Sequence, residues 1–246
     1  LTGKRSKKQF HYVSTLSAIT PFFHREGFAS EMIGPTHSSR AIIRMSGYPL
    51  TKYVSEVFLS KITEVIPDWM VTIYRPGTIA GHSKTGHFNL EAFVNKYICG
   101  MIQLGYHPYS KKYNMGFDVV PVDQVAQMIV YLSRYCVHSI YHVNHFYGTH
   151  ALSMDQLIYF VNSLGYDVRN EKYCDWKQRL FASFETTDNV LKPLKGYFLD
   201  GYPSESNADC RNSISLLREN KEIFERIRPI QKNIVQAWLG YAARHQ

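Results

Sequence analysis

Residues 47–77 read GYPLTKYVSEVFLSKITEVIPDWMVTIYRPG, and this stretch decides the fold class. From Thr51 its first half carries apolar residues at helical spacing until Pro67, so we predict an amphipathic helix. These residues are Val54, Val57, Phe58, Ile62 and Val65. Residues 69–74 form a continuous apolar, β-branched run that is stopped by Arg75-Pro76-Gly77. Such a run is typical of a buried parallel strand that ends in a turn.

The sequence upstream of this stretch begins with another strand. Residues 10–19 form a short β-prone run that ends in the hydroxyl side chains of Ser14, Thr15 and Ser17. Residues 21–47 are rich in Gly, Pro, Ser and His with little periodicity, which indicates a long surface excursion.

The downstream sequence continues the alternation of helices and strands. We predict a helix capped by Asn89 and ending at Gly105, followed by a strand over residues 117–122. A second helix capped by Asp123 and a strand over residues 139–144 complete the series. This order favours an α/β fold with a mostly parallel sheet.

The pattern changes after Gly148. Helical segments follow one another with only weak strand signals between them, at residues 154–164, 175–184, 214–224 and 232–243. We therefore predict two parts, an α/β part over residues 1–148 and a mainly helical subdomain over residues 149–246.

Composition restricts the class of protein further. The chain has 246 residues, of which 45% are hydrophobic, and a formal net charge of +8. No apolar run approaches the roughly 18 residues of a membrane span, and no secretory leader is recognisable, so we expect a cytoplasmic protein. The basic residues are spread along the chain, which disfavours a nucleic-acid module. The cysteines lie far apart and lack metal-ligand spacing, so we expect reduced thiols and no metal: Cys99, Cys136, Cys174 and Cys210.

Tyr48 and Lys52 suggest a chemical function. Four residues apart at the start of a helix, they share one face. A lysine ammonium beside a phenol favours the phenolate, so the tyrosine can donate or accept a proton near neutral pH. A hydroxyl from a neighbouring strand end would polarise a carbonyl oxygen, as hydride transfer to a carbonyl requires. The spacing also arises by chance, and the alternative is a surface tyrosine beside a solvated lysine.

Six motifs occur in a distinctive order: YVSTLS at residues 12–17, GYPLTK at 47–52, YRPGTIAG at 74–81, TGHFN at 85–89, GMIQLG at 100–105 and VVPVD at 119–123. In this order they resemble the thioester reductase domains of the extended short-chain dehydrogenase/reductase superfamily. Such domains end nonribosomal peptide synthetases, polyketide synthases, carboxylic acid reductases and aminoadipate reductases. The resemblance extends from about Phe10 to Leu180 and rests most on the last four motifs.

The resemblance implies a Rossmann-like, doubly wound parallel sheet of the extended type that lacks its N-terminal strands. Residues 1–148 would then be the C-terminal part of the NADP-binding domain. Residues 149–246 would bind the substrate and its carrier.

The resemblance also assigns roles to individual residues. Thr15 would polarise the carbonyl, with Ser14 and Ser17 as substitutes. Tyr48 would be the acid, and Lys52 would contact the ribose of the cofactor. The cofactor-binding residues would be Ser14, Tyr48, Lys52, Pro76, Gly77 and Ile79.

The implied reaction is NADPH-dependent reduction of an acyl thioester to an aldehyde, or onward to an alcohol. The acyl group would arrive on the phosphopantetheine arm of an acyl or peptidyl carrier protein. Because such carriers are acidic, the net charge of +8 would favour the encounter.

Two departures from the family pattern leave alternatives open. Thr51 replaces the usual serine, and the family's glycine-rich G-x-x-G-x-x-G unit, which holds the pyrophosphate, does not occur. We therefore expect a fragment that is inactive alone and binds NADPH weakly. The alternatives are a fatty acyl-CoA reductase, an inactive interaction domain with the same fold and a basic nucleic-acid-binding protein.

Overall fold

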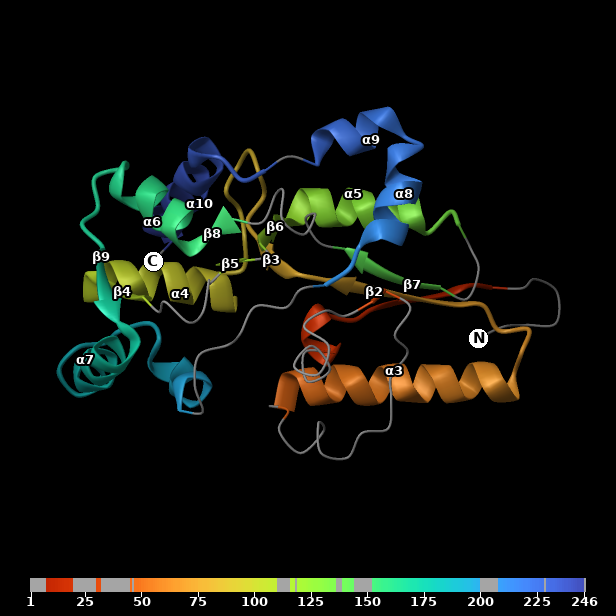
Figure 1. The fold of residues 1–246 in the computed structure, drawn as a ribbon, viewed down its shortest axis with the longest axis horizontal. Helices are drawn as coiled ribbons and strands as arrows, with labels where there is room; N and C mark the ends of the chain where they lie inside the picture. The colour runs from red at the N-terminus through yellow and green to blue at the C-terminus, as the bar shows by residue number, and fades with distance from the viewer. Residues whose placement is uncertain are drawn as a thin grey trace. The chain divides into compact units, whose positions relative to one another are not determined.

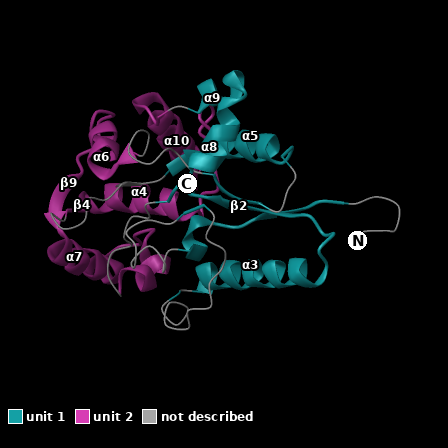
Figure 2. Ribbon diagram, turned by 45° about the vertical axis from the view of Figure 1, so that its right-hand side comes forward, with its two compact units in different colours: residues 1–78, 118–150, 206–228 teal, residues 79–117, 151–205, 229–246 magenta. Residues whose placement is uncertain are grey.

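The computed structural model describes residues 8–19, 30–31, 45, 47–109, 116–117, 119–135, 139–143, 152–199, 208–227 and 229–245. The chain forms two compact units, each made of three segments (Figure 2). Unit 1 comprises residues 1–78, 118–150 and 206–228, and unit 2 comprises residues 79–117, 151–205 and 229–246. The chain therefore passes between the units several times, whereas the sequence predicted a single division after residue 148.

A parallel sheet forms the centre of unit 1 (Figure 1). Its strands are β1 (Phe10–Val13), β2 (Val71–Pro76) and β7 (Ser139–Val143), in the order β1-β2-β7. The central strand β2 is buried along its whole length. It extends two residues beyond its predicted end because Arg75 and Pro76 still pair with β7.

Alternate residues of β2 face opposite layers of helices. Ile73 packs in a cluster with Leu59 of α3 (Gly47–Val65), whereas Tyr74 packs in a cluster with Met128 of α5 (Val122–Leu132). Figure 1 shows α3 and α5 on opposite sides of the sheet. Two helical layers on one parallel sheet are the doubly wound arrangement that the sequence predicted.

Helix α3 forms as predicted, but its buried face is different. Val54 and Phe58, on the predicted apolar face, are 55% and 63% exposed. The buried positions are Pro49, Tyr53, Glu56 and Leu59. The apolar pattern was misleading because the buried face includes a charged residue, Glu56, whose partner lies in β2.

Helix α5 begins two positions earlier than the sequence suggested. Its N-cap is Pro121, and Asp123 lies inside the first turn, so the prediction that Asp123 caps this helix is wrong. The carboxylate is nevertheless well placed there, because a negative charge in the first turn interacts favourably with the helix dipole.

Helix α4 (Phe93–Leu104) starts later than predicted. Its N-cap is Ala92, because the Asn89 side chain accepts the N–H of Glu91 (3.0 Å) in a separate turn ahead of the helix. The predicted end at Gly105 is confirmed, and Gly105 adopts the left-handed conformation (φ 74°) that often closes a helix.

The remaining elements of unit 1 are η1 (Leu16–Ile19), β6 (Val119–Pro121), α8 (Arg211–Arg218) and α9 (Lys221–Arg226). The single helix predicted over residues 214–224 is thus two helices, and both belong to the unit that holds the sheet. They are separate because the side chain of Asn220 caps α9 by accepting the N–H of Ile223 (3.1 Å).

Unit 2 is mainly helical and has two small strand pairs. Its helices are α4, α6 (Met154–Asn162), α7 (Tyr173–Thr186), η2 (Lys192–Phe198) and α10 (Lys232–His245). β4 (Tyr106–Tyr109) pairs in parallel with β9 (Arg169–Lys172), and β5 (Gly116–Phe117) pairs antiparallel with β8 (Leu152–Ser153). β3 (Thr78–Ala80) follows β2 in the chain.

Candidate active site

Lys52 reaches from α3 to the carboxyl end of β1. Its Nζ donates a hydrogen bond to the carbonyl oxygen of Val13 (2.9 Å) and lies 5.1 Å from the ring centre of Tyr12. Val13 is the last residue of β1 and directly precedes Ser14 and Thr15. This contact therefore brings a helix cation to the strand end where sequence analysis expected the hydroxyl groups.

Tyr48 lies in the first turn of the same helix. Its side chain is 58% exposed, and its carbonyl oxygen accepts the hydroxyl of Thr51 (2.7 Å). Because residues four apart share a helix face, Tyr48 and Lys52 lie on the same side of α3. The phenol is accessible from solvent, as a group that meets a substrate must be.

The three candidate hydroxyls differ in their surroundings. Thr15 Oγ1 accepts the backbone N–H of Ser17 (3.2 Å) and donates to Ser17 Oγ (3.3 Å). Ser14 is 3% exposed; its backbone N–H continues the sheet by donating to Tyr74 (2.7 Å). Within the described part of the chain, Ser14 Oγ is buried and has no hydrogen-bond partner. An unsatisfied buried hydroxyl is costly, so Ser14 needs a partner.

The residues expected beside the nicotinamide follow β2. Pro76 ends the strand opposite Val143, and the N–H of Gly77 donates to the Val143 carbonyl (3.2 Å). Ile79 lies in β3 with 37% of its surface exposed. Pro76 and Gly77 thus lie at the carboxyl edge of the sheet, where open α/β folds bind their ligands.

A buried ion pair joins α3 to β2 and was missed by the sequence analysis. Arg75 Nε donates to both carboxylate oxygens of Glu56 (3.0 and 3.2 Å), and its Nη2 lies 2.5 Å from Glu56 Oε2. Both side chains are fully buried. The sequence signal for this pair is an arginine at the end of an apolar strand, a position that also fits the start of a turn.

His142 of β7 extends this contact. Its Nε2 lies 3.3 Å from Arg75 Nη1 and its Nδ1 lies 2.5 Å from the carbonyl oxygen of Asp209. Because the carbonyl only accepts, Nδ1 carries the proton and Nε2 accepts from Arg75. Burial, and then the positive charge of Arg75, lower the pKa of His142 to about 3, so this side chain is neutral.

Glu31, which lies within the excursion predicted over residues 21–47, contacts strand β7. Its carboxylate accepts the N–H groups of His142 (3.0 Å), Asn212 (2.7 Å) and Ser213 (3.2 Å), and also the Ser213 hydroxyl. Burial raises the pKa of Glu31. Since Asn212 and Ser213 open α8, Glu31 acts as a cap supplied by a distant segment.

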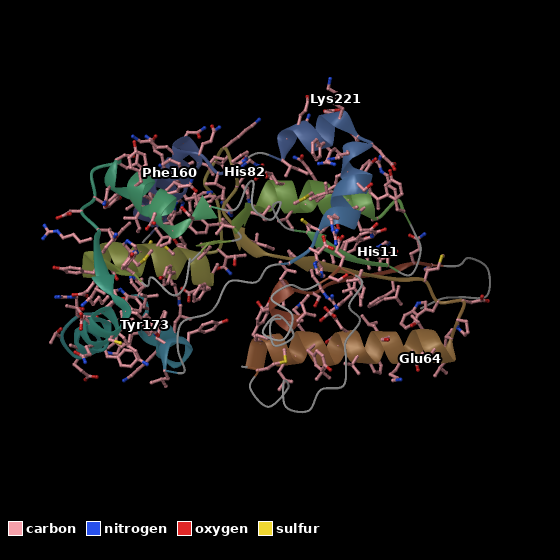
Figure 3. All side chains as sticks on the ribbon, in the orientation of Figure 1. His11, Glu64, His82, Phe160, Tyr173 and Lys221 are labelled. Atoms are coloured by element: carbon pink, nitrogen blue, oxygen red, sulfur yellow. The ribbon has the colours of Figure 1, made fainter. Side chains whose placement is uncertain are left out.

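Gly86 of the TGHFN motif and Gly81, which ends the YRPGTIAG motif, have a structural reason within unit 2. Gly86 has φ 73°, and a Cβ placed on it would lie 1.9 Å from the carbonyl oxygen of Ala237 in α10. A Cβ on Gly81 would lie 2.6 Å from the ring of Trp238. His82, labelled in Figure 3, accepts the N–H of Lys84 (3.1 Å) in the same loop. These glycines therefore allow the loop to lie directly against α10.

The described residues offer neither a metal centre nor a membrane-spanning helix. No group of three or more His, Cys, Asp or Glu side chains there could hold a metal ion. No helix in those ranges is both long and apolar enough to cross a membrane.

Residues 1–129 match the family model described as "Male sterility protein". Among curated proteins, the chain is 29% identical over 180 residues to the L-2-aminoadipate reductase of Saccharomyces cerevisiae, covering 71% of this chain and 13% of that protein. It is 26% identical over 211 residues to a linear gramicidin synthase of Brevibacillus parabrevis, covering 84% and 4%. The chain thus spans a small part of these relatives.

Solved structures share the fold. The terminal R domain of the myxalamid PKS-NRPS pathway superposes with a TM-score of 0.79 at 22% identity, covering 97% of this chain and 58% of that one. The reductase domain of a non-ribosomal peptide synthetase from Mycobacterium tuberculosis gives 0.73 at 19% identity, covering 97% and 61%. The predicted extended Rossmann-like fold is thereby confirmed.

Proposed function

The chain belongs to the Male sterility protein family, and from this premise we propose that it reduces an acyl thioester on a carrier protein to an aldehyde, with NADPH as the reductant. One contact carries the proposal: Lys52 Nζ donates to the carbonyl oxygen of Val13 (2.9 Å). This contact joins the helix that carries Tyr48 in its first turn to the strand end that leads into Ser14 and Thr15.

Two features of this strand end support a nicotinamide cofactor. Ser14 Oγ is buried without a partner among the described residues and so has an open hydrogen-bonding capacity. An ammonium has three N–H groups, and Val13 takes one of those on Lys52. We propose that the cofactor is held by Ser14, Tyr48, Lys52, Pro76, Gly77 and Ile79. When bound, NADPH would supply the hydride.

Tyr48 and Thr15 would act on the carbonyl oxygen of the substrate. The Thr15 hydroxyl would donate a hydrogen bond to it, and the Tyr48 phenol would donate a proton as negative charge develops there. The carbon–sulfur bond of the resulting hemithioacetal then breaks, so the oxygen loses its proton and the aldehyde leaves together with the thiol of the carrier arm. Lys52 would stabilise the phenolate electrostatically until Tyr48 is reprotonated.

We propose an acyl or peptidyl carrier protein with a phosphopantetheine arm as the partner. The net charge of +8 supports an acidic partner. Support also comes from relatives that are named as synthases or synthetases, such as the linear gramicidin synthase. The rival substrate is a soluble acyl-CoA. Aldehyde reduction is a second activity to consider, because a relative from Aspergillus flavus, 28% identical over 197 residues, is named aldehyde reductase lnaA.

A direct assay compares the three substrates. The protein is extended upstream by a glycine-rich pyrophosphate-binding unit, the same acyl group is offered as a carrier-bound thioester, as an acyl-CoA and as the free aldehyde, and NADPH oxidation and products are followed. We expect the highest kcat/KM for the carrier-bound thioester, with aldehyde released. A higher kcat/KM for the acyl-CoA would assign the protein to the acyl-CoA reductases, and no hydride transfer to any of the three would contradict the proposal.

A further inference from the structure

The buried ion pair of Glu56 and Arg75 links two elements that the proposed reaction needs. These are α3, which carries Tyr48 and Lys52, and the end of β2 at Pro76. Glu56 is four residues after Lys52 and eight after Tyr48 on α3. Arg75 directly precedes Pro76 and Gly77. The pair thus connects the helix of the proposed acid to the strand end of the proposed cofactor site.

The contacts of Arg75 hold its guanidinium on two sides. Nε and Nη2 bind the Glu56 carboxylate, and Nη1 faces Nε2 of His142. His142 is fixed in turn by the carbonyl oxygen of Asp209. A bidentate arginine–carboxylate pair is specific in direction as well as distance, so α3 has little freedom to slide along or rotate against β2.

Stability alone is a weak explanation for such a pair. Taking two charges out of water costs about as much as their attraction returns, and apolar residues of similar volume often replace buried ion pairs without loss of stability. What apolar side chains do not reproduce is the fixed direction of the hydrogen bonds. The pair is therefore better explained by the position it imposes on α3.

We propose that Glu56 and Arg75 are positioning residues that hold α3 in the register at which Lys52 reaches Val13 and Tyr48 meets the substrate. The role of Tyr48 in this statement rests on the proposed function, whereas the register of Lys52 does not. Misplacing a catalytic group by about 1 Å can lower a rate by about 10². A small slip of α3 would therefore lower the rate of the proposed reaction.

The test replaces both charges at once. The double variant Glu56→Met/Arg75→Met fills the space without leaving an unpaired buried charge. Its folding is checked by urea unfolding, and the rate at which each lysine is acylated is measured by mass spectrometry on residues 1–246. Lys61 is the internal control, because it lies on the same helix and pairs with exposed Glu64, labelled in Figure 3 at the opposite end of α3 from Tyr48.

We expect Lys52 to be acylated about three- to tenfold faster in the folded double variant than in wild type. This factor is the equilibrium constant of one ordinary hydrogen bond. The acylation rate of Lys61 should be the same in the double variant as in wild type. The matched variant Glu64→Gln, which breaks an exposed pair of the same helix, should leave Lys52 protected. If the double variant does not fold, Arg75→Lys is used instead, since it keeps the charge but loses the bidentate geometry.

Activity separates the two ideas. If wild type reduces the thioester, the kcat of the double variant should be lower by about 10², with the KM for the thioester little changed. If wild type reduces no thioester, the proposed function fails, but the acylation of Lys52 still decides the positioning role. A folded variant in which Lys52 is as protected as in wild type would overturn the inference.

Discussion

Ser14 and Thr15 are adjacent, yet their hydroxyls are in different situations. Thr15 Oγ1 holds the turn after β1 by accepting the N–H of Ser17, whereas Ser14 Oγ is buried without a partner within the described ranges. The lone pair of Thr15 Oγ1 that accepts the Ser17 N–H contributes to folding and is separate from the hydrogen that the hydroxyl would donate to a substrate, whereas the unsatisfied Ser14 Oγ is better explained by a ligand.

Substitution should separate these two roles. Thr15→Val should lower the free energy of unfolding by about 1 kcal/mol, because the N–H of Ser17 loses its acceptor. Ser14→Ala should change the free energy of unfolding by no more than about 0.5 kcal/mol and should instead raise the KM for NADPH. Urea unfolding and initial rates measure both quantities. A Ser14→Ala variant that is strongly destabilised, or that keeps its KM for NADPH, would contradict this assignment.

His142 should make stability depend on pH. Its pKa is about 3 in the folded chain and about 6.5 when unfolded, so the unfolded state binds the extra proton. Its contribution is therefore fully present above pH ~6.5 and is lost as the pH falls. Between pH 7 and pH 5, wild type should lose about 2 kcal/mol more of its unfolding free energy than His142→Gln. Equal losses in urea titrations at the two pH values would show that His142 is not held neutral.

The shared helix face of Tyr48 and Lys52 could be predicted from their spacing, but the buried ion pair of Arg75 could not. The Tyr48 and Lys52 pattern lies within five consecutive residues, so local sequence contains it. The partner of Arg75 lies 19 residues away on another element, and its burial depends on the tertiary packing. The role of Glu31 is even less accessible, because the α8 backbone it caps is 181 residues further along.

At the scale of elements, the contact of the Gly81 and Gly86 loop with α10 leaves no room for a larger residue at either glycine. Gly86 combines a positive φ with a backbone carbonyl where a Cβ would lie. Gly165 has φ 100° but open space around it, which makes it a matched control. Replacing each by alanine therefore separates backbone strain from steric conflict.

Gly86→Ala should lower the free energy of unfolding by about 2 to 5 kcal/mol, the sum of left-handed strain and overpacking. Gly165→Ala should cost only the strain, about 1 to 2 kcal/mol. Thermal and urea unfolding of both variants measure the difference. Equal losses would mean that α10 does not lie against Gly86 in solution.

The sequence predicted the existence of elements with strong local signals well, but it predicted the caps and breaks of the helices poorly. β2 and the end of α4 at Gly105 follow from apolar runs and glycine. The caps predicted at Asn89 and Asp123 are wrong because the N-cap positions are Ala92 and Pro121, which have no side-chain capping hydrogen bond and so leave no capping signal in the sequence. The segment 214–224 was predicted as one helix because periodicity continues across the break that Asn220 makes.

At the scale of the whole molecule, the division into two units is what the sequence least reveals. A change of pattern near Gly148 suggested one boundary, but the chain returns to the sheet-containing unit with residues 206–228 and leaves it again. Such returns depend on long-range contacts, for example the packing of Leu217 against the layer that contains Tyr74. The family, in contrast, was recognisable from the order of short motifs.

The central claim is that Tyr48 donates the proton in a thioester reduction that uses NADPH. The direct measurement, made on the domain completed by its glycine-rich pyrophosphate-binding unit, is aldehyde release from one carrier-bound thioester by wild type and by Tyr48→Phe, together with the affinity of each for NADPH. We predict that the variant is slower by about 10² to 10⁴, with NADPH affinity little changed, and that it loses still more activity on the free aldehyde. Equal rates for the two proteins on both substrates would contradict the account.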